Sequence, residues 1–191
     1  MSSLVGVDGI VQIGEHRFRR MIDQEVIAGR IAELGAELTE AYAGRLPLLV
    51  GVLNGAAPFH ADLARAMEIP LTVDFLRVGS YGNGMSSSGT LDFTAECSTL
   101  IAGRNVIIVE DIVDTGRTIR RLREYFAGRG AASVAVAAML YKQEADLIGI
   151  RPEYVGFTIP DRFVVGFGLD YRQEGRNLRH VYVLEGQAAE T

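Results

Sequence analysis

One short stretch constrains the fold of this 191-residue chain more than any other. Val106 to Val109 form an apolar, mostly β-branched run that predicts a buried strand, and we expect the strand to end at Glu110 and Asp111. A loop rich in Asp, Thr and Gly follows. It leads into an amphipathic helix with apolar positions at Ile119, Leu122, Tyr125 and Phe126. Strand, loop and helix in this order predict one unit of an open α/β sheet.

The loop of this unit carries groups that suit a phosphorylated ligand. Small ligands bind at the carboxyl ends of strands in such sheets, and the free N–H groups at a helix start attract phosphate. Gly116 allows a close backbone approach, and Thr115 and Thr118 offer hydroxyl donors. Adjacent carboxylates repel a phosphate, so they suit a ribose diol, a magnesium ion or a proton transfer. For any single residue, an ordinary turn in which Asp114 caps the helix explains the pattern equally well.

A second unit of the same kind precedes the first. Leu48 to Leu53 predict a central parallel strand, Asn54-Gly55 a tight loop, and Phe59, Leu63 and Met67 a following helix. The Asn-Gly pair alone fits a simple turn. Further strands are expected at 71–78 and 132–140. Lys142 is then expected at the same sheet edge as the acidic pair. The alternative is that its side chain only extends its ammonium group into solvent.

The remaining segments are assigned by periodicity and composition. Apolar spacing predicts a helix from Glu15 to about Tyr42, a strand or hairpin arm at 90–100 and a last strand at 180–184. A long loop is expected at 79–89. Two short β runs joined by a Pro-Asp turn are expected between 152 and 171. In that segment Phe163 suits stacking on a flat base, although a core aromatic residue is an equal alternative.

Two of these stretches carry a family resemblance. Residues 108–118, with two hydrophobic residues followed by Glu-Asp-x-x-Asp-Thr-Gly-x-Thr, resemble the phosphoribosyl-pyrophosphate (PRPP) motif of type I phosphoribosyltransferases. Residues 152–171 resemble the carboxy-terminal hood of the hypoxanthine–guanine members. The resemblance covers nearly all of 48–184. It implies one domain, 1–191, with a central mostly parallel sheet, a flexible active-site loop, and a hood formed largely by 150–191 with the N-terminal segment.

The resemblance also implies an activity, namely Mg²⁺-dependent transfer of 5-phosphoribosyl from PRPP to a 6-oxopurine in purine salvage. Hypoxanthine is the first expected base, and guanine and xanthine are alternatives. The implied roles are as follows: Asp114 as the catalytic base; Glu110, Asp111, Asp114, Thr115, Gly116, Arg117 and Thr118 on PRPP; Asn54, Gly55 and Arg176 on pyrophosphate; Lys142, Phe163 and Val164 on the purine; Glu110, Asp111 and Asp170 on magnesium; Ser80 and Tyr81 in the flexible loop. Relatives often have a cis peptide bond after the residue that matches Asn54.

Composition narrows the partners and the compartment. The net charge of −5 disfavours a general nucleic-acid or anionic-membrane surface. The single cysteine, Cys97, excludes an internal disulfide and fits a reducing cytoplasm, and one cysteine with three scattered histidines gives no zinc pattern. No signal peptide, membrane-spanning run, Walker loop or dinucleotide fingerprint is found. Family members usually form homodimers or homotetramers. A PRPP- or nucleotide-sensing regulator on the same fold is the alternative function.

Overall fold

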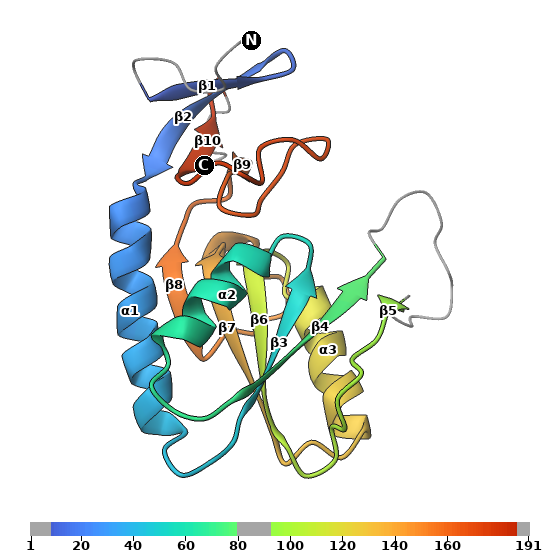
Figure 1. Cartoon of the computed structure of the whole chain (residues 1–191). Coiled ribbons are helices and arrows are strands. Elements are labelled where there is room, and N and C mark those ends of the chain that lie inside the picture. The colour runs from blue at the N-terminus through green and yellow to red at the C-terminus, as the bar shows by residue number, and fades with distance from the viewer. Residues whose placement is uncertain (1–8, 80–92, 187–191) are drawn as a thin grey trace, which may run out of the picture.

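The computed structural model describes residues 9–79 and 93–186, and they form two sheets with three α-helices (Figure 1). The six-stranded large sheet has the order β5-β4-β3-β6-β7-β8, and the four-stranded small sheet has the order β1-β2-β10-β9. The large-sheet strands are β3 (Leu48–Leu53), β4 (Thr72–Val78), β5 (Phe93–Ala95), β6 (Asn105–Val113), β7 (Ser133–Tyr141) and β8 (Tyr154–Thr158). The small-sheet strands are β1 (Ile10–Ile13), β2 (His16–Ile22), β9 (Val164–Val165) and β10 (Val181–Leu184).

The large sheet is parallel except for β5, which pairs with β4 in the antiparallel direction. Alternate residues of its strands pack on opposite faces. Ile107 and Val109 of β6 pack in the cluster that contains α1 (Gln24–Ala41) and α2 (Ala57–Ala66). Val106 and Ile108 pack in the cluster that contains α3 (Arg117–Gly128). Both faces of β6 are therefore buried, which confirms the strand and the α/β class predicted from its continuous apolar run.

Strand β6 is longer than the sequence pattern predicted. It continues through the acidic pair to Val113, whereas we expected it to end at the acids. The reason lies in the neighbouring strand: Glu110 pairs with Ala138, and Val113 pairs with Tyr141, so β7 offers a hydrogen-bonding partner along the whole segment. The carboxylates of Glu110 and Asp111 are therefore attached to a rigid strand and not to a loop.

The helix predicted from Glu15 to about Tyr42 was wrong over its first turns. Residues 16–22 form β2, and helix α1 begins only at Gln24. Gly14, at a φ of +57°, turns the chain between β1 and β2. Phe18 and Ile22 are buried four residues apart, a spacing that also occurs on a helix face, which explains the error. Helix α1 itself runs unbroken through Gly29 and Gly35; a side chain at Gly35 would meet Ala66 of α2.

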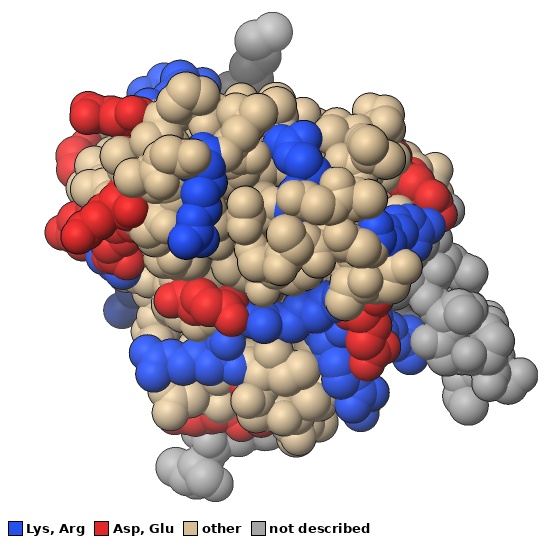
Figure 2. All heavy atoms as spheres, turned by 90° about the horizontal axis from the view of Figure 1, so that it is seen from below, with Lys and Arg blue, Asp and Glu red and all other residues tan. Residues whose placement is uncertain are grey.

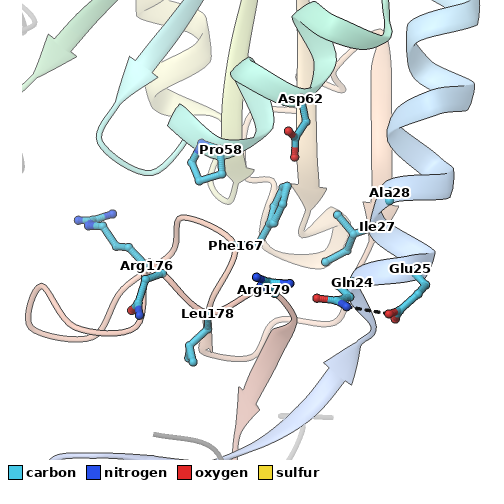
Figure 3. A pocket seen from close by; sticks show the side chains of 11 residues that line it. Gln24, Glu25, Ile27, Ala28, Pro58, Asp62, Phe167, Arg176, Leu178 and Arg179 are labelled. Atoms are coloured by element: carbon cyan, nitrogen blue, oxygen red, sulfur yellow. Dashed lines mark hydrogen bonds between the residues drawn. The ribbon is translucent and has the colours of Figure 1, made fainter.

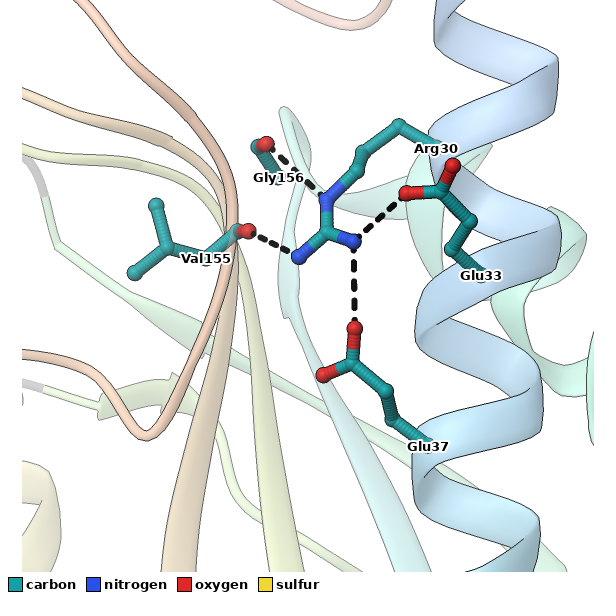
Figure 4. A network of polar contacts seen from close by, with 5 residues as sticks. All are labelled: Arg30, Glu33, Glu37, Val155 and Gly156. Carbon is teal, nitrogen blue, oxygen red and sulfur yellow. Dashed lines mark hydrogen bonds and ion pairs between the residues drawn. The ribbon is translucent and has the colours of Figure 1, made fainter.

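Helix α1 also covers the open edge of the large sheet. Arg30 donates hydrogen bonds to the carbonyl oxygens of Val155 (2.9 Å) and Gly156 (3.2 Å) in the edge strand β8, and it pairs with Glu33 and Glu37 (Figure 4). An unpaired strand edge invites association with other chains, so this contact protects it.

The small sheet joins the two ends of the described chain. Strand β10 lies between β2 and β9, at the carboxyl end of the large-sheet strands (Figure 1). The two short β runs near the Pro-Asp turn, β8 and β9, belong to different sheets and do not form a hairpin. Among the described residues, no helix is long and apolar enough to cross a membrane.

Candidate functional site

A cavity of about 240 Å³ lies where β6 passes into α3. Most of the predicted PRPP residues line it, together with three apolar ones: Glu110, Asp111, Ile112, Val113, Asp114, Thr115, Gly116, Thr118 and Ile119. Gly116 is the N-cap of α3 at a φ of +74°, and no side chain caps the helix by a hydrogen bond. The free N–H groups of the first turn are therefore available to an anion. The alternative reading of Asp114 as a helix cap is wrong.

Arg117 points elsewhere. It lines a neighbouring hollow of about 390 Å³ with Thr115, Thr118, Arg120 and Arg121. The predicted PRPP residues are thus brought together except for this side chain, which is exposed on the first turn of α3.

The acidic pair is electrostatically strained by burial. Glu110 is only 6% exposed, and desolvation, with the neighbouring Asp111, raises its pKa well above the ordinary value. Desolvation raises the pKa of Asp111 to about 6, and the charge of Asp170 acts in the same direction, whereas backbone N–H groups and Arg176 oppose it. A cation or a set of hydroxyl donors bound here would relieve this cost.

The Asn54-Gly55 loop closes against the acidic pair. A Cβ at Gly55 would lie 1.6 Å from Oδ2 of Asp111, so only glycine fits there. A Cβ at Gly168 would lie 1.9 Å from the carbonyl oxygen of Gly55, which brings the C-terminal segment onto the same loop. Arg77 donates to Oδ1 of Asn54 at 2.7 Å. The cis peptide bond precedes Asn54, at Leu53–Asn54, and not after it as the resemblance suggested.

Asp170 and Arg176, predicted as separate ligands, contact each other. Nη2 of Arg176 lies 2.5 Å from Oδ1 of Asp170, and Nη1 donates to the carbonyl oxygen of Gly168 at 2.8 Å. The buried Nε of Arg176 has no hydrogen-bond partner among the described residues. The pair sits close enough to Asp111 to shift its pKa, so the C-terminal segment faces the acidic pair.

Lys142 connects the β6 loop with the C-terminal segment. Lys142 is 8% exposed, and its Nζ lies 3.3 Å from Oδ2 of Asp114 and 2.9 Å from Oδ1 of Asp161. Asp114 and Asp161 are both about half exposed, so solvent and ligands reach them. The ammonium group is therefore held between two carboxylates at the edge of the sheet.

The two remaining base-side residues belong to the small-sheet region. Val164 is buried in the edge strand β9, opposite Val183 of β10. Phe163 is 38% exposed, and its ring centroid lies 6.3 Å from that of Phe18 and 6.0 Å from that of Tyr171. The equal alternative of a fully buried core aromatic does not hold for Phe163. Ser80 and Tyr81 lie outside the described residues.

Two residues of the site region were not predicted from the sequence. They are Gly168, whose backbone packs against Gly55, and Asp161, which accepts a hydrogen bond from Lys142. A hollow of about 490 Å³ lies between the start of α1, the start of α2 and residues 167–179, and Arg176 lines it (Figure 3). The Gly-x-Gly spacing at 166–168 was the available signal for a close backbone contact.

The expected magnesium ligands are not preassembled as a trio. In the described ranges 9–79 and 93–186, the one group of three ligand-type side chains with mutually close atoms is Asp23, Glu25 and His180. Glu110, Asp111 and Asp170 form no such group there.

The doubly wound sheet, with a helix start, hydroxyls and acids around one small cavity at its carboxyl edge, defines an α/β protein of the class that binds sugar phosphates or nucleotides. The chain belongs to the phosphoribosyl transferase domain family, whose pattern matches residues 21–172. The expected type I phosphoribosyltransferase fold and transferase class are thereby confirmed.

Individual relatives agree with this membership. The chain is 43% identical to a hypoxanthine-guanine phosphoribosyltransferase of Streptococcus pneumoniae and 47% identical to one of Streptococcus agalactiae, each over 86% of this chain and 92% of the relative. A crystal structure of a hypoxanthine phosphoribosyltransferase from Staphylococcus aureus aligns with a TM-score of 0.82 and 36% identity, covering 87% of this chain and 91% of the other. A hypoxanthine-guanine phosphoribosyltransferase from Bacillus anthracis aligns with a TM-score of 0.81 and 33% identity over 86% and 96% of the two chains.

Proposed function

We propose that this protein transfers the 5-phosphoribosyl group of PRPP to hypoxanthine, and also to guanine, releasing pyrophosphate and the nucleoside monophosphate. The observation that carries the proposal is the contact of Lys142 with Asp114 at the rim of the β6–α3 cavity. It puts a donor for the 6-oxo group of a purine beside an acceptor for a ring proton. Family membership and the names of the relatives support the same reaction.

On the PRPP side, the proposed roles follow the geometry of β6 and its loop. Thr115, Thr118 and the free N–H groups of α3 would bind the 5′-phosphate, and Glu110 and Asp111 would accept hydrogen bonds from the ribose hydroxyls. The backbone of Asn54-Gly55 and Arg176 would receive the pyrophosphate. Some members of the family have a lysine at the position of Asn54; here the guanidinium of Arg77, bonded to Asn54, would supply positive charge to that loop.

On the base side, Phe163 would stack on the purine and the backbone at Val164 would meet its edge. Lys142 would donate to the 6-oxo group, a contact that adenine, with an amino group there, cannot accept. Asp114 would accept or share the proton at N7 as the bond to the ribose forms, because it lies within reach of the same ring edge. Departure of pyrophosphate leaves positive charge on the ribose, and the carboxylates beside it would stabilise that charge.

Asp111 and Asp170 fit a magnesium ion. Mg²⁺ is held in proteins through one or two carboxylates, waters and substrate phosphates, so a preassembled trio is unnecessary. Burial raises the pKa of Asp111 to about 6, and a bound cation would favour its charged form. A bound Mg²⁺ would neutralise phosphate charge on PRPP and pyrophosphate. Glu110, with 6% exposure, lies deeper and would support Asp111 from within.

The wider setting is also a proposal. We infer a homodimer or homotetramer in the cytoplasm, supported by the family membership and by a single half-buried cysteine. Nucleic acid and membrane are not expected partners. On the face shown in Figure 2, basic and acidic side chains are interspersed, which does not favour a polyanion surface on that side. The small sheet, with residues 9–22 and 163–186, would act as the hood within a single domain.

The test is turnover with PRPP, Mg²⁺ and each of hypoxanthine, guanine, xanthine and adenine, followed by pyrophosphate release. We expect turnover with 6-oxopurines, and Asp114→Asn to lower kcat by about 100-fold or more. Glu40→Gln, which removes the charge of an exposed carboxylate on α1, is the control and should retain wild-type rates. Tight PRPP binding without turnover on any base would instead favour a PRPP-sensing regulator.

A further inference from the structure

Gly116, in the wall of the β6–α3 cavity, has a carboxylate directly behind it. A Cβ on Gly116 would lie 2.9 Å from Oδ1 of Asp146 and 3.7 Å from the Cβ of Ile150. Gly116 is also the N-cap of α3, and its carbonyl oxygen accepts the hydrogen bond from Arg120 N–H at 3.0 Å. The backbone at this position therefore separates the cavity from Asp146 by the thickness of one residue.

Asp146 is held in place by several donors. Its Oδ2 accepts the hydroxyl of Tyr141 at 2.9 Å, and its Oδ1 accepts the N–H groups of Ile148 at 3.1 Å and Gly149 at 2.9 Å. Desolvation opposes the charged form, yet these hydrogen bonds outweigh it and lower the pKa of Asp146 below its ordinary value. The carboxylate is thus a fixed, ionised group and not a mobile surface acid.

One of these donors, Tyr141, ties Asp146 to the large sheet. Tyr141 is the last residue of β7, 4% exposed, and pairs in register with Val113 at the end of β6. The N–H of Lys142 donates to the carbonyl oxygen of Val113 at 2.9 Å. The segments that follow β6 and β7 therefore leave the sheet side by side. Asp146, in the segment after β7, packs against Gly116, in the segment after β6.

We propose that Asp146 is a positioning residue for the 5′-phosphate loop: it fixes Gly116 and the start of α3 so that the loop's N–H groups converge on the phosphate. The inference rests on the proposed function. A negative charge near a phosphate site repels the ligand, so the benefit must come from the shape of the carboxylate and its hydrogen bonds. Asparagine keeps that shape without the charge.

The experiment measures the affinity of ribose 5-phosphate by calorimetry, together with KM for PRPP and for hypoxanthine. Asp146→Ala should raise the Kd of ribose 5-phosphate and the KM for PRPP by about 10-fold, because displacing a binding loop by a fraction of an ångström is costly. The kcat and the KM for hypoxanthine should stay within about twofold. Asp146→Asn should match the wild type or bind ribose 5-phosphate more tightly, because the repelling charge is gone.

Two further variants keep the test decisive. Tyr141→Phe removes one donor and keeps the buried ring, so it should weaken binding of ribose 5-phosphate by a smaller factor than Asp146→Ala. Glu144→Ala, an exposed acid in the same turn, should change nothing. Equal weakening by Asp146→Ala and Asp146→Asn, or unchanged affinity in Asp146→Ala, would overturn the proposal. Because the binding measurement needs no turnover, an inactive wild type would refute the proposed function and leave this test standing.

Discussion

The large sheet and the small sheet differ in topology and in the residues that they contribute to the site. The parallel strands of the large sheet carry Glu110, Asp111 and Arg77, and Asp114 and Lys142 follow directly after β6 and β7. The small sheet is antiparallel and joins residues near the two ends of the chain. It has a core of its own, made of Val11, Ile13, Phe18, Val165, Leu178 and Tyr182.

This difference places the buried acidic residues of the site in one sheet and the exposed aromatic residue in the other. The large sheet holds Glu110 and Asp111 on a strand buried on both faces, where the surroundings perturb their pKa and cannot easily relax. The small sheet offers Phe163, a half-exposed aromatic, next to an edge strand. A region with a small separate core opens more readily than a central sheet. We therefore expect residues on and next to the large sheet to determine 5′-phosphate and ribose binding and, through Lys142, selection of the 6-oxo group. We expect the small-sheet region to determine stacking on the base.

The strongest way to break this division is to separate the two regions at their backbone contact. Gly168→Ala places a Cβ 1.9 Å from the carbonyl oxygen of Gly55 at a φ of +100°, so one of the two loops must move. We expect kcat/KM to fall by about 10³-fold, equivalent to about 4 kcal/mol. Gly103→Ala, at a φ of +75° with open space around it, is the control for backbone strain alone. Equal losses in the two variants would show that the contact is unimportant.

Removing a buried phenylalanine ring from each of the two cores should lower hydrogen-exchange protection in different strands. Phe18→Ala in the small sheet and Phe126→Ala in α3 each remove a fully buried ring, at a cost of about 3 kcal/mol. By hydrogen exchange, Phe18→Ala should speed exchange in β2 and β10 and leave β6 and β7 protected, because its cluster is separate. Phe126→Ala should weaken protection in β6 and β7. Uniform acceleration in both variants would mean that the sheets unfold as one unit.

Base affinity offers a sharper comparison with a smaller effect. Phe163→Ala should raise the KM for hypoxanthine by about 10-fold, about 1.4 kcal/mol, through loss of stacking. The KM for PRPP should change by less than about twofold, because most of its proposed ligands lie on β6 and in the loop that follows it. Leu147→Ala, an exposed apolar residue at 72% exposure, serves as the control. A parallel rise in both KM values would contradict the division of roles.

The smallest effect concerns pH and the large-sheet core. His60 is 2% exposed, and burial lowers its pKa although a hydrogen bond to the Leu49 carbonyl opposes the shift. The unfolded chain therefore takes up this proton more readily, so stability from neutral His60 is fully present above pH 6.5 and declines as pH falls below it. His60→Phe should flatten this part of the urea-denaturation profile between pH 7.5 and 5.5. Parallel profiles for the two proteins would exclude His60 as the cause.

Much of the large sheet could be predicted from the sequence because its signals are local. Continuous apolar runs at 48–53 and 106–109 are typical of strands buried on both faces, and the apolar positions of α3 recur with helical period. The lengths of elements were less accessible. Strand β6 extends to Val113 because β7 supplies a partner, and that partner is more than twenty residues away in the chain.

The N-terminal segment shows the limit of periodicity. Residues 16–22 have no local reason to prefer β2 over a helix; the strand forms because β1 and β10 complete its hydrogen bonds on both sides. The same holds for Asp146 behind Gly116 and for Gly168 against Gly55, since both are contacts between segments distant in sequence.

By itself, the sequence determined the chemistry of this protein: the acids, hydroxyls and glycine of the β6–α3 loop, the lysine that ends β7, and the family to which they belong. These depend on residue type and short spacing. Only the tertiary structure decided which of them meet. Lys142 bridges Asp114 and Asp161, Arg176 pairs with Asp170, and burial raises the pKa of Asp111 to about 6. Those outcomes depend on distance and desolvation, which arise when remote segments pack together.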